Sequence, residues 1–84
     1  MPRIKSQELV ERITNGAFDV VKLSGSQGGA FYMLLEGSDG SFIHENSDGS
    51  LKEYPHADYA LKWLKRNTGL TEVIVNIELW QTDE

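Results

Sequence analysis

The sequence predicts an α+β domain of two layers, in which two helices pack against a mostly antiparallel five-stranded sheet. Three features of the sequence predict this fold. Apolar residues alternate with polar ones in several short segments, two other segments carry apolar residues at helical spacing, and glycine-containing turns separate the segments. The expected order of elements is α-β-β-β-β-α-β: a helix, a four-stranded meander, a second helix and a C-terminal strand.

The first element is expected to be a helix over residues 7–15. Ser6 is a candidate N-cap, and Gly16 is a candidate C-terminal stop. The residues of its short apolar stripe are Leu9, Val10 and Ile13.

Four strands are expected next, because these segments are rich in β-branched and aromatic residues or alternate between glycine-containing turns. Their ranges are 17–23, 30–36, 41–46 and 51–55. The SGSQGG segment at 24–29 is interpreted as a flexible hairpin connection, with a partner-binding loop as the alternative. It lacks the Lys-Ser/Thr pair of a phosphate-binding loop, so we expect no nucleotide there.

The second helix and the final strand occupy the remainder of the chain. Helical spacing begins at His56 and should end at Gly69. The apolar residues of this helix are Ala57, Ala60, Leu61 and Leu64. The segment 71–80 then alternates as a strand, and its expected core residues are Val73, Val75, Ile77 and Leu79.

The final strand is expected beside the 17–23 strand and antiparallel to it, with a parallel position beside the fourth strand as the alternative. Both helices should cover one face of the sheet, because each apolar stripe needs a partner; the alternative is that they divide between the faces. The 84 residues are expected to form one domain, with residues 1–5 as a disordered N-terminus and 81–84 as an acidic tail.

The tetrapeptide SDGS occurs twice, at 38–41 and 47–50. Asp-Gly between alternating segments is typical of a two-residue type I′ turn, since both central positions need positive φ. This register would place Glu45 opposite Lys52, Leu35 opposite His44 and Ile43 opposite Tyr54. Phe42 and Leu51 would then share one face of the sheet. An EF-hand loop or a calcium-binding nonapeptide array fits worse, because the acidic residues do not follow the required spacing.

One face of the predicted sheet is unusually apolar for a surface in contact with water. If both helices cover the other face, this second face is the best candidate for binding a protein, including another copy in a homodimer. Its apolar residues are Tyr32, Leu34, Ile43, Tyr54, Ile74 and Trp80.

The negative charge is concentrated in one part of the chain. The net charge is −5, and the segment 36–58 contains six acidic residues and one basic residue. Ordinary nucleic-acid binding is therefore disfavoured, since it depends on clustered Lys and Arg. The acidic hairpins could bind a basic protein or mimic a nucleic acid. The residues assigned to this role are Glu36, Asp39, Glu45 and Asp48.

No catalytic, cofactor or metal site is assigned from the sequence. The chain has no cysteine, so thiolate ligands and Cys nucleophiles are excluded. A small metal-dependent enzyme is the third functional alternative, because its ligand types are present. The residues concerned are His44, Glu53, His56 and Asp58, but their spacing matches no metal signature.

A cytoplasmic, non-membrane protein is expected, since the sequence contains neither a signal peptide nor a membrane-spanning segment. The layout resembles that of many small bacterial proteins of unknown function, some from plasmids or phages. SDGS and ALKWLKRNTGLTEVIV carry most of this resemblance. The resemblance assigns no functional residue. A non-enzymatic binding or regulatory protein is the function that the sequence favours.

Overall fold

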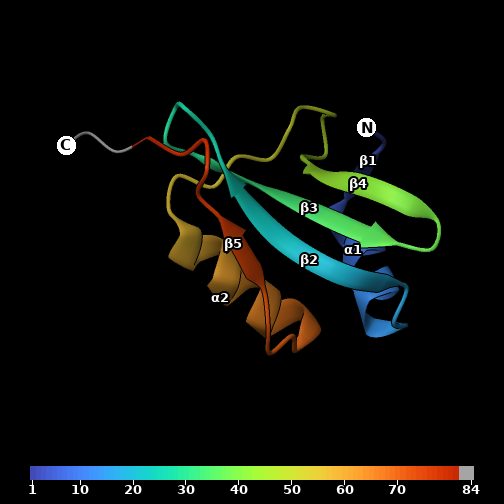
Figure 1. Ribbon diagram of the computed structural model, residues 1–84. Helices are drawn as coiled ribbons and strands as arrows, with labels where there is room; N and C mark the ends of the chain where they lie inside the picture. Colours follow the sequence, from blue (N-terminus) through green and yellow to red (C-terminus); the bar gives the residue numbers. More distant parts are fainter. Residues whose placement is uncertain (82–84) are drawn as a thin grey trace.

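The computed structural model describes residues 1–81 as an α+β fold with two helices and five strands (Figure 1). This confirms the predicted class and the two helices. The elements, in chain order, are β1 (Arg3–Lys5), α1 (Ser6–Thr14), β2 (Phe18–Gly25), β3 (Phe31–Gly37), β4 (Gly40–Glu45), α2 (Ala57–Thr68) and β5 (Ile74–Asn76). Residues 82–84 of the expected acidic tail lie outside the described part.

The sheet is mixed, and the prediction of a mostly antiparallel sheet was wrong. The strand order is β1-β4-β3-β2-β5. The three central strands form an antiparallel meander, whereas β1 pairs in parallel with β4 and β5 pairs in parallel with β2. Both edge strands are therefore attached through parallel pairing.

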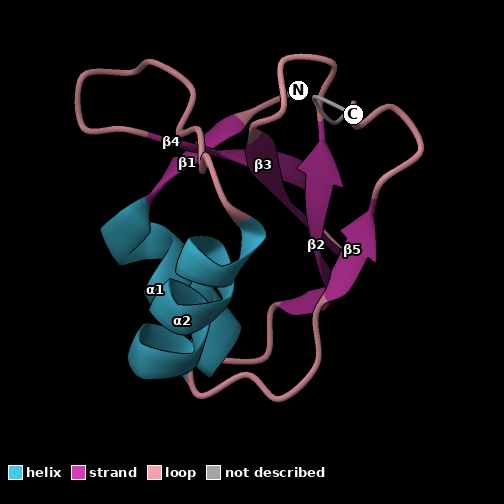
Figure 2. Cartoon of the chain, turned by 90° about the vertical axis from the view of Figure 1, so that its left-hand side faces the viewer, coloured by secondary structure: helices cyan, strands magenta, loops and turns pink. Residues whose placement is uncertain are grey.

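Two connections that run in the same direction explain why both helices lie on one face. The β1-α1-β2 connection and the β4-α2-β5 connection each join parallel strands, and each moves three places along the strand order in the same sense. Crossovers of this kind are almost always right-handed. Two right-handed crossovers in the same direction place their helices on the same side, and Figure 2 shows α1 and α2 together there.

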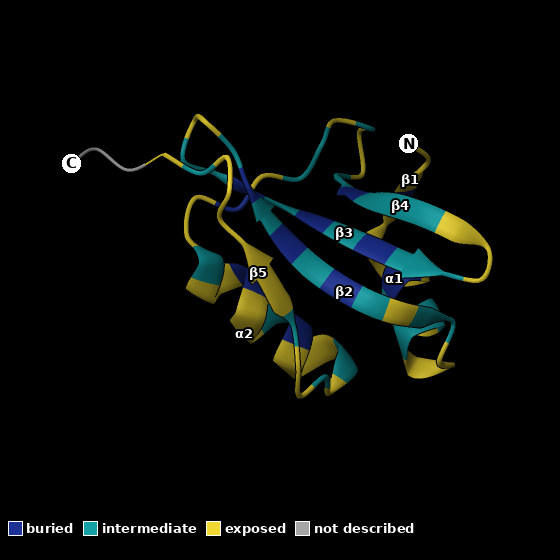
Figure 3. Ribbon diagram, in the orientation of Figure 1, coloured by how far each residue is buried: buried dark blue, intermediate teal, exposed yellow. Residues whose placement is uncertain are grey.

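The hydrophobic core lies between the helices and this face of the sheet. Buried positions alternate along β2 and β3, as half-covered strands require (Figure 3). The buried apolar residues are Ile4, Leu9, Val21, Leu23, Phe31, Met33, Leu35, Tyr54, Ala60 and Leu64.

The N-terminus contains a strand where we expected disorder. Residues Arg3–Lys5 pair with Ile43–Glu45, and Ile4 is 1% exposed in the core. A single apolar residue between two cations gives no periodic signal. Strand β1 depends on a partner that lies far along the chain.

The first Asp-Gly turn has a different register from the predicted one. Gly37 pairs with Gly40, so Ser38 and Asp39 occupy the two central positions. Within residues 1–81 positive φ occurs at glycines only, which excludes a type I′ turn here, and Gly40 has φ 113°. Leu35 consequently pairs with Phe42 instead of His44. The partner changes by two residues, so the predicted faces of β3 and β4 are retained.

The predicted register of the second turn is wrong by one residue, and this error changes the faces of the residues that follow the turn. Asn46 and Ser50 close a longer loop, and Glu45 pairs with Leu51 instead of Lys52. A slip of one residue moves side chains to the opposite face. Leu51 is thus on the face of Glu45 and not on that of Phe42.

Residues 51–55, expected as a strand, contribute single bridges only, at Leu51 and Tyr54. Tyr54 pairs with Phe31 instead of Ile43 and enters the core.

The final strand is shorter than predicted, and its orientation was wrong. It is adjacent to β2, as expected, but it runs parallel to it and covers only Ile74–Asn76. The parallel direction follows from the crossover through α2, because β4 and β2 already point the same way. The predicted core face was also largely wrong. Val73 packs against the core, whereas Val75, Ile77 and Leu79 are exposed.

The helix ends agree with the glycine signals but not with the predicted N-cap. Gly16 and Gly69 both have φ 74°, one following each helix, as a left-handed helix end requires. Lys5 takes the N-cap position of α1 and Ser6 is the first helical residue. The Ser6 hydroxyl instead contacts a buried histidine, described below.

Candidate functional site

The face of the sheet opposite the helices is the first candidate surface. Lys22 on β2 alternates with the buried Val21 and Leu23, so its side chain lies on this open face. Pairing in register then defines one row across all five strands, and side chains directly opposite share a face. The row is Ile74, Lys22, Leu34, Ile43 and Arg3.

Four of the six predicted apolar residues lie on the open face. Leu34, Ile43 and Ile74 belong to the row, and Tyr32 pairs with Ser24 beside it. Among residues 1–81 no helix covers them, since both helices pack on the opposite side (Figure 2). The open face is therefore apolar across its centre, where Ile74 is exposed and Tyr32, Leu34 and Ile43 are half-buried.

Tyr54 and Trp80 are not on the open face, which corrects the prediction for both. Tyr54 is buried and lies beside His44, with 6.1 Å between the ring centroids. The one-residue slip of the second turn accounts for its position.

Trp80 lies on the core side, because the chain turns back after β5. Its ring is 5.7 Å from that of Phe31, and its Nε1 donates to the Gly29 carbonyl oxygen at 3.1 Å. Gly25 provides the space: a Cβ at this position would lie 2.5 Å from the Cβ of Trp80.

Charged groups interleave with the apolar residues of the open face. Lys22 Nζ lies 3.6 Å from a carboxylate oxygen of Glu36, with both side chains partly exposed. At one end of the face the Tyr32 hydroxyl donates to Glu53 at 2.6 Å. This hydrogen bond to a carboxylate raises the pKa of Tyr32 above its ordinary value of 10.0. Arg3 and Lys22 place positive charge on a face that the sequence indicated as acidic and apolar.

The four acidic residues assigned to the hairpins do not form one patch. Asp39 and Asp48 lie in turns at opposite ends of β4. Glu45 pairs with Lys5 at 2.7 Å, and Glu36 pairs with Lys22. Two of the four charges are therefore opposed by a basic side chain.

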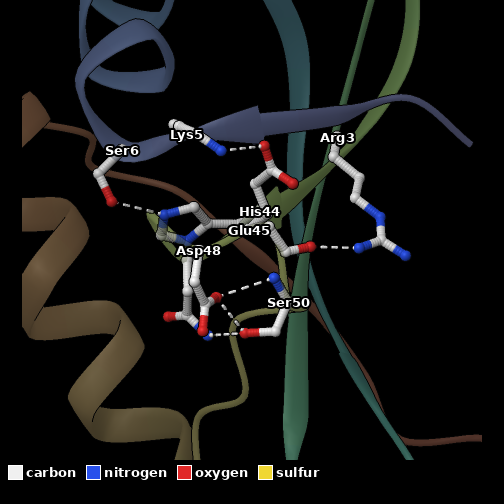
Figure 4. A network of polar contacts seen from close by, with 9 residues as sticks. Arg3, Lys5, Ser6, His44, Glu45, Asp48 and Ser50 are labelled. Atoms are coloured by element: carbon white, nitrogen blue, oxygen red, sulfur yellow. Dashed lines mark hydrogen bonds and ion pairs between the residues drawn. The ribbon is translucent and has the colours of Figure 1, made fainter.

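Asp48 stabilises the second turn. Its carboxylate accepts hydrogen bonds from the backbone N–H of Ser50 at 2.9 Å and from the Ser50 hydroxyl at 2.6 Å (Figure 4). These hydrogen bonds lower the pKa of Asp48 below 3.8, the side-chain bond first. This geometry identifies SDGS at 47–50 as a turn motif.

His44 is a buried polar residue, 1% exposed, and Figure 4 shows its ring directed towards Ser6. Its Nε2 is 2.8 Å from Ser6 Oγ, and its Nδ1 is 3.3 Å from the Tyr54 hydroxyl. The Trp63 ring lies 5.2 Å away, centroid to centroid. Burial, with a smaller contribution from the charge of Lys52, lowers the pKa of His44 from 6.5 to about 4. Burial also raises the pKa of Tyr54 to about 12.

The Ser6–His44 contact has the geometry of a nucleophile and a base, but its electrostatics favour a structural role. A general base is most effective when its pKa is near the working pH. A buried imidazole with a pKa of about 4 accepts a proton poorly at neutral pH. The two hydroxyl groups instead satisfy both ring nitrogens, as a buried polar side chain requires.

The four residues considered as metal ligands are dispersed. His44 is in the core, whereas Glu53 binds Tyr32 on the outside of the sheet. His56 packs against Tyr59, and Asp58 lies 3.6 Å from Lys62. Residues 1–81 bring together no group of three His, Cys, Asp or Glu side chains that could hold a metal ion.

The glycine-rich loop borders a shallow cavity of about 710 Å³, which sequence reasoning did not identify. Gly29, Glu53, His56 and Trp80 are among its lining residues. Ser26 accepts from Gly29 and donates to Ala30 through its backbone, so this loop is a hydrogen-bonded turn. The cavity lies between this turn and the segment after β4. No local sequence pattern indicates that these two parts of the chain are close.

Comparison with known proteins identified no relative. No helix among residues 1–81 has the length and apolar character needed to cross a membrane. No protein-family model, curated protein or solved structure matched the chain.

Proposed function

We propose that this chain is a small non-enzymatic protein-binding domain that uses the open face of its sheet. The row from Ile74 to Arg3 carries this proposal, because it places one exposed and two half-buried apolar side chains, from three strands, on a face that the helices do not cover. Exposed apolar patches rimmed by polar groups are typical of protein interaction sites.

The composition of the row indicates the kind of partner. Leu34 and Ile43 are adjacent in the register and form its apolar centre, while Lys22 and Arg3 add positive charge within the same row. Because Lys22 is already opposed by Glu36, a partner surface with an apolar centre and a rim of mixed charge would match this face. The proposed function therefore assigns recognition to the face and not to the acidic turns.

A capture experiment with matched variants tests the proposal. The immobilised chain would be exposed to extract of its native host, and bound proteins identified by mass spectrometry. Leu34→Glu combined with Ile43→Glu should abolish capture of the specific partner, since it places two charges at the apolar centre. Leu61→Glu is the control, because Leu61 is exposed on α2 and lies outside the face.

Three results would contradict the proposal. These are capture of no specific partner, capture that survives the double substitution, and equal loss with the control. Circular dichroism of each variant would establish that the fold is retained. A salt series separates the acidic-mimic alternative: an apolar interface should persist at high ionic strength, whereas a polyanion mimic should dissociate.

A further inference from the structure

Strand β5 forms an exposed, uncharged edge of the sheet (Figure 3). It pairs with β2 on one side, and within residues 1–81 no strand pairs with its outer side. Ile74 is 57% exposed and Val75 is 41% exposed; two more apolar residues follow, Ile77 at 58% and Leu79 at 63%. An edge of this type offers backbone hydrogen-bonding groups to another strand.

The opposite edge of the sheet differs in a way that narrows the choice of partner. Strand β1 carries Arg3 and Lys5, and Pro2 precedes it. Charged residues and proline on an edge strand are the usual protection against further pairing. Strand β5, with the sequence IVN, has neither. A head-to-tail contact between β1 and β5 is therefore disfavoured, and contact of β5 with itself remains.

We infer that two copies of this chain pair through β5, antiparallel about a two-fold axis. The two five-stranded sheets would join into one continuous sheet, and each copy would use the same edge. This inference goes beyond the proposed function, because it concerns backbone pairing along the edge of the sheet; the Ile74 side chain also belongs to the row on the open face.

The sequence around β5 selects one register among those that a two-fold axis allows. Paired residues must share a face, so the axis can pass through Ile74, Val75 or Asn76. An axis at Val75 would place Glu72 opposite Glu78, and like charges directly opposite are destabilising. An axis at Asn76 would place Ile74 opposite Glu78.

An axis at Ile74 pairs apolar residues with apolar residues and a carboxylate with an amide. Ile74 then lies opposite Ile74 of the second copy, and Val73 lies opposite Val75. Glu72 lies opposite Asn76, whose side-chain oxygen already accepts from the backbone N–H of Glu78 at 2.9 Å. The amide nitrogen of Asn76 can therefore donate to the Glu72 carboxylate. This register is self-complementary and is the one that we assign.

A charge at the axis tests the association. Sedimentation velocity across the micromolar range should show a concentration-dependent dimer, weak because the paired segment is short. Ile74→Lys would place two ammonium groups opposite each other and should weaken association by at least about tenfold. Leu79→Lys is the control, since Leu79 is similarly exposed and lies three residues beyond Asn76, the last residue of the assigned pairing; dimerisation of this variant should be unchanged.

Cysteine cross-linking tests the register, since the chain has no cysteine of its own. Directly opposite residues have Cα atoms about 4.5–5.5 Å apart, within the range of a disulfide. Ile74→Cys should therefore form a disulfide dimer rapidly on oxidation. Asn76→Cys is the control, because its counterpart would lie about 13 Å away along the strands.

Several outcomes would overturn the inference. These are a wild-type chain that stays monomeric throughout, equal effects of the two lysine substitutions, and equally fast cross-linking at positions 74 and 76. The Leu34→Glu, Ile43→Glu variant should still dimerise. Loss of partner capture with retained dimerisation would support both proposals separately.

Discussion

Ser6 Oγ lies 2.8 Å from Nε2 of the buried His44, and this contact joins the first residue of α1 to the strand beside it. The Tyr54 hydroxyl, on the segment after β4, lies 3.3 Å from the other ring nitrogen, Nδ1. One imidazole thus connects three separate parts of the chain, which makes the stability of the fold depend on its protonation state.

We predict that acid destabilises the protein through His44. The folded state lowers the pKa of His44 to about 4, against 6.5 when unfolded, so folding favours the neutral ring. The contribution of neutral His44 to the free energy of unfolding is fully present above pH 6.5, and it is lost progressively as the pH falls towards 4. The loss should be on the order of 3 kcal/mol. Urea unfolding at a series of pH values measures it.

The control for this prediction is the second histidine. His44→Gln should remove most of the pH dependence between 6.5 and 4, whereas His56→Gln, a change at an exposed residue, should retain it. An unfolding free energy of the wild type that stays constant across this range would show that His44 does not act in this way.

We predict that Ser6→Ala destabilises the fold by about 1–2 kcal/mol, because it leaves a buried ring nitrogen without its hydrogen bond. Helix propensity acts in the opposite direction, since alanine is the better helix former. Ser47→Ala, at an exposed turn position, should change the free energy of unfolding by less than about 0.5 kcal/mol. Equal unfolding midpoints for wild type and Ser6→Ala in urea would contradict the prediction.

We predict that Gly25→Ala displaces Trp80. A Cβ at position 25 would lie 2.5 Å from the Cβ of Trp80, so the indole must move away from Phe31. The free energy of unfolding should fall by about 1–3 kcal/mol. The near-ultraviolet circular dichroism of tryptophan should change as well.

Gly28→Ala is the matched control, since its nearest neighbouring atom would be 3.8 Å away. If both alanine variants unfold at the same denaturant concentration and keep the wild-type spectrum, the packing of Trp80 over Gly25 has no energetic role.

Local pattern was sufficient to predict both helices and the three central strands. The stripe that includes Leu9 and the left-handed end at Gly69 are determined within a few residues of chain, and they were placed correctly. Strand β1 could not be predicted in this way, because Ile4 is its single buried residue and its pairing with β4 is distant in sequence.

The prediction of the candidate surfaces depended on turn geometry, which the sequence specifies less well than it specifies helices and strands. Asp-Gly is compatible with several turns that differ by one residue in loop length. At the turn before Gly40 the partner residues shifted by two, which kept the predicted faces, so Leu34 and Ile43 were correctly grouped. At Gly49 it moved Tyr54 into the core. Trp80 was misplaced for another reason: the strand ends at Asn76, and the alternation was extended beyond it.

The attachment of both edge strands by parallel pairing has a consequence for how the chain folds. Lys5 and Glu45 are 40 residues apart, whereas the strands of the central meander follow one another directly. Contacts that close long loops form late, because their entropic penalty comes before their gain. We therefore expect the central meander to form first and the two edge strands, β1 and β5, to pair with it last. The same edge strands should be first to detach when the native state fluctuates.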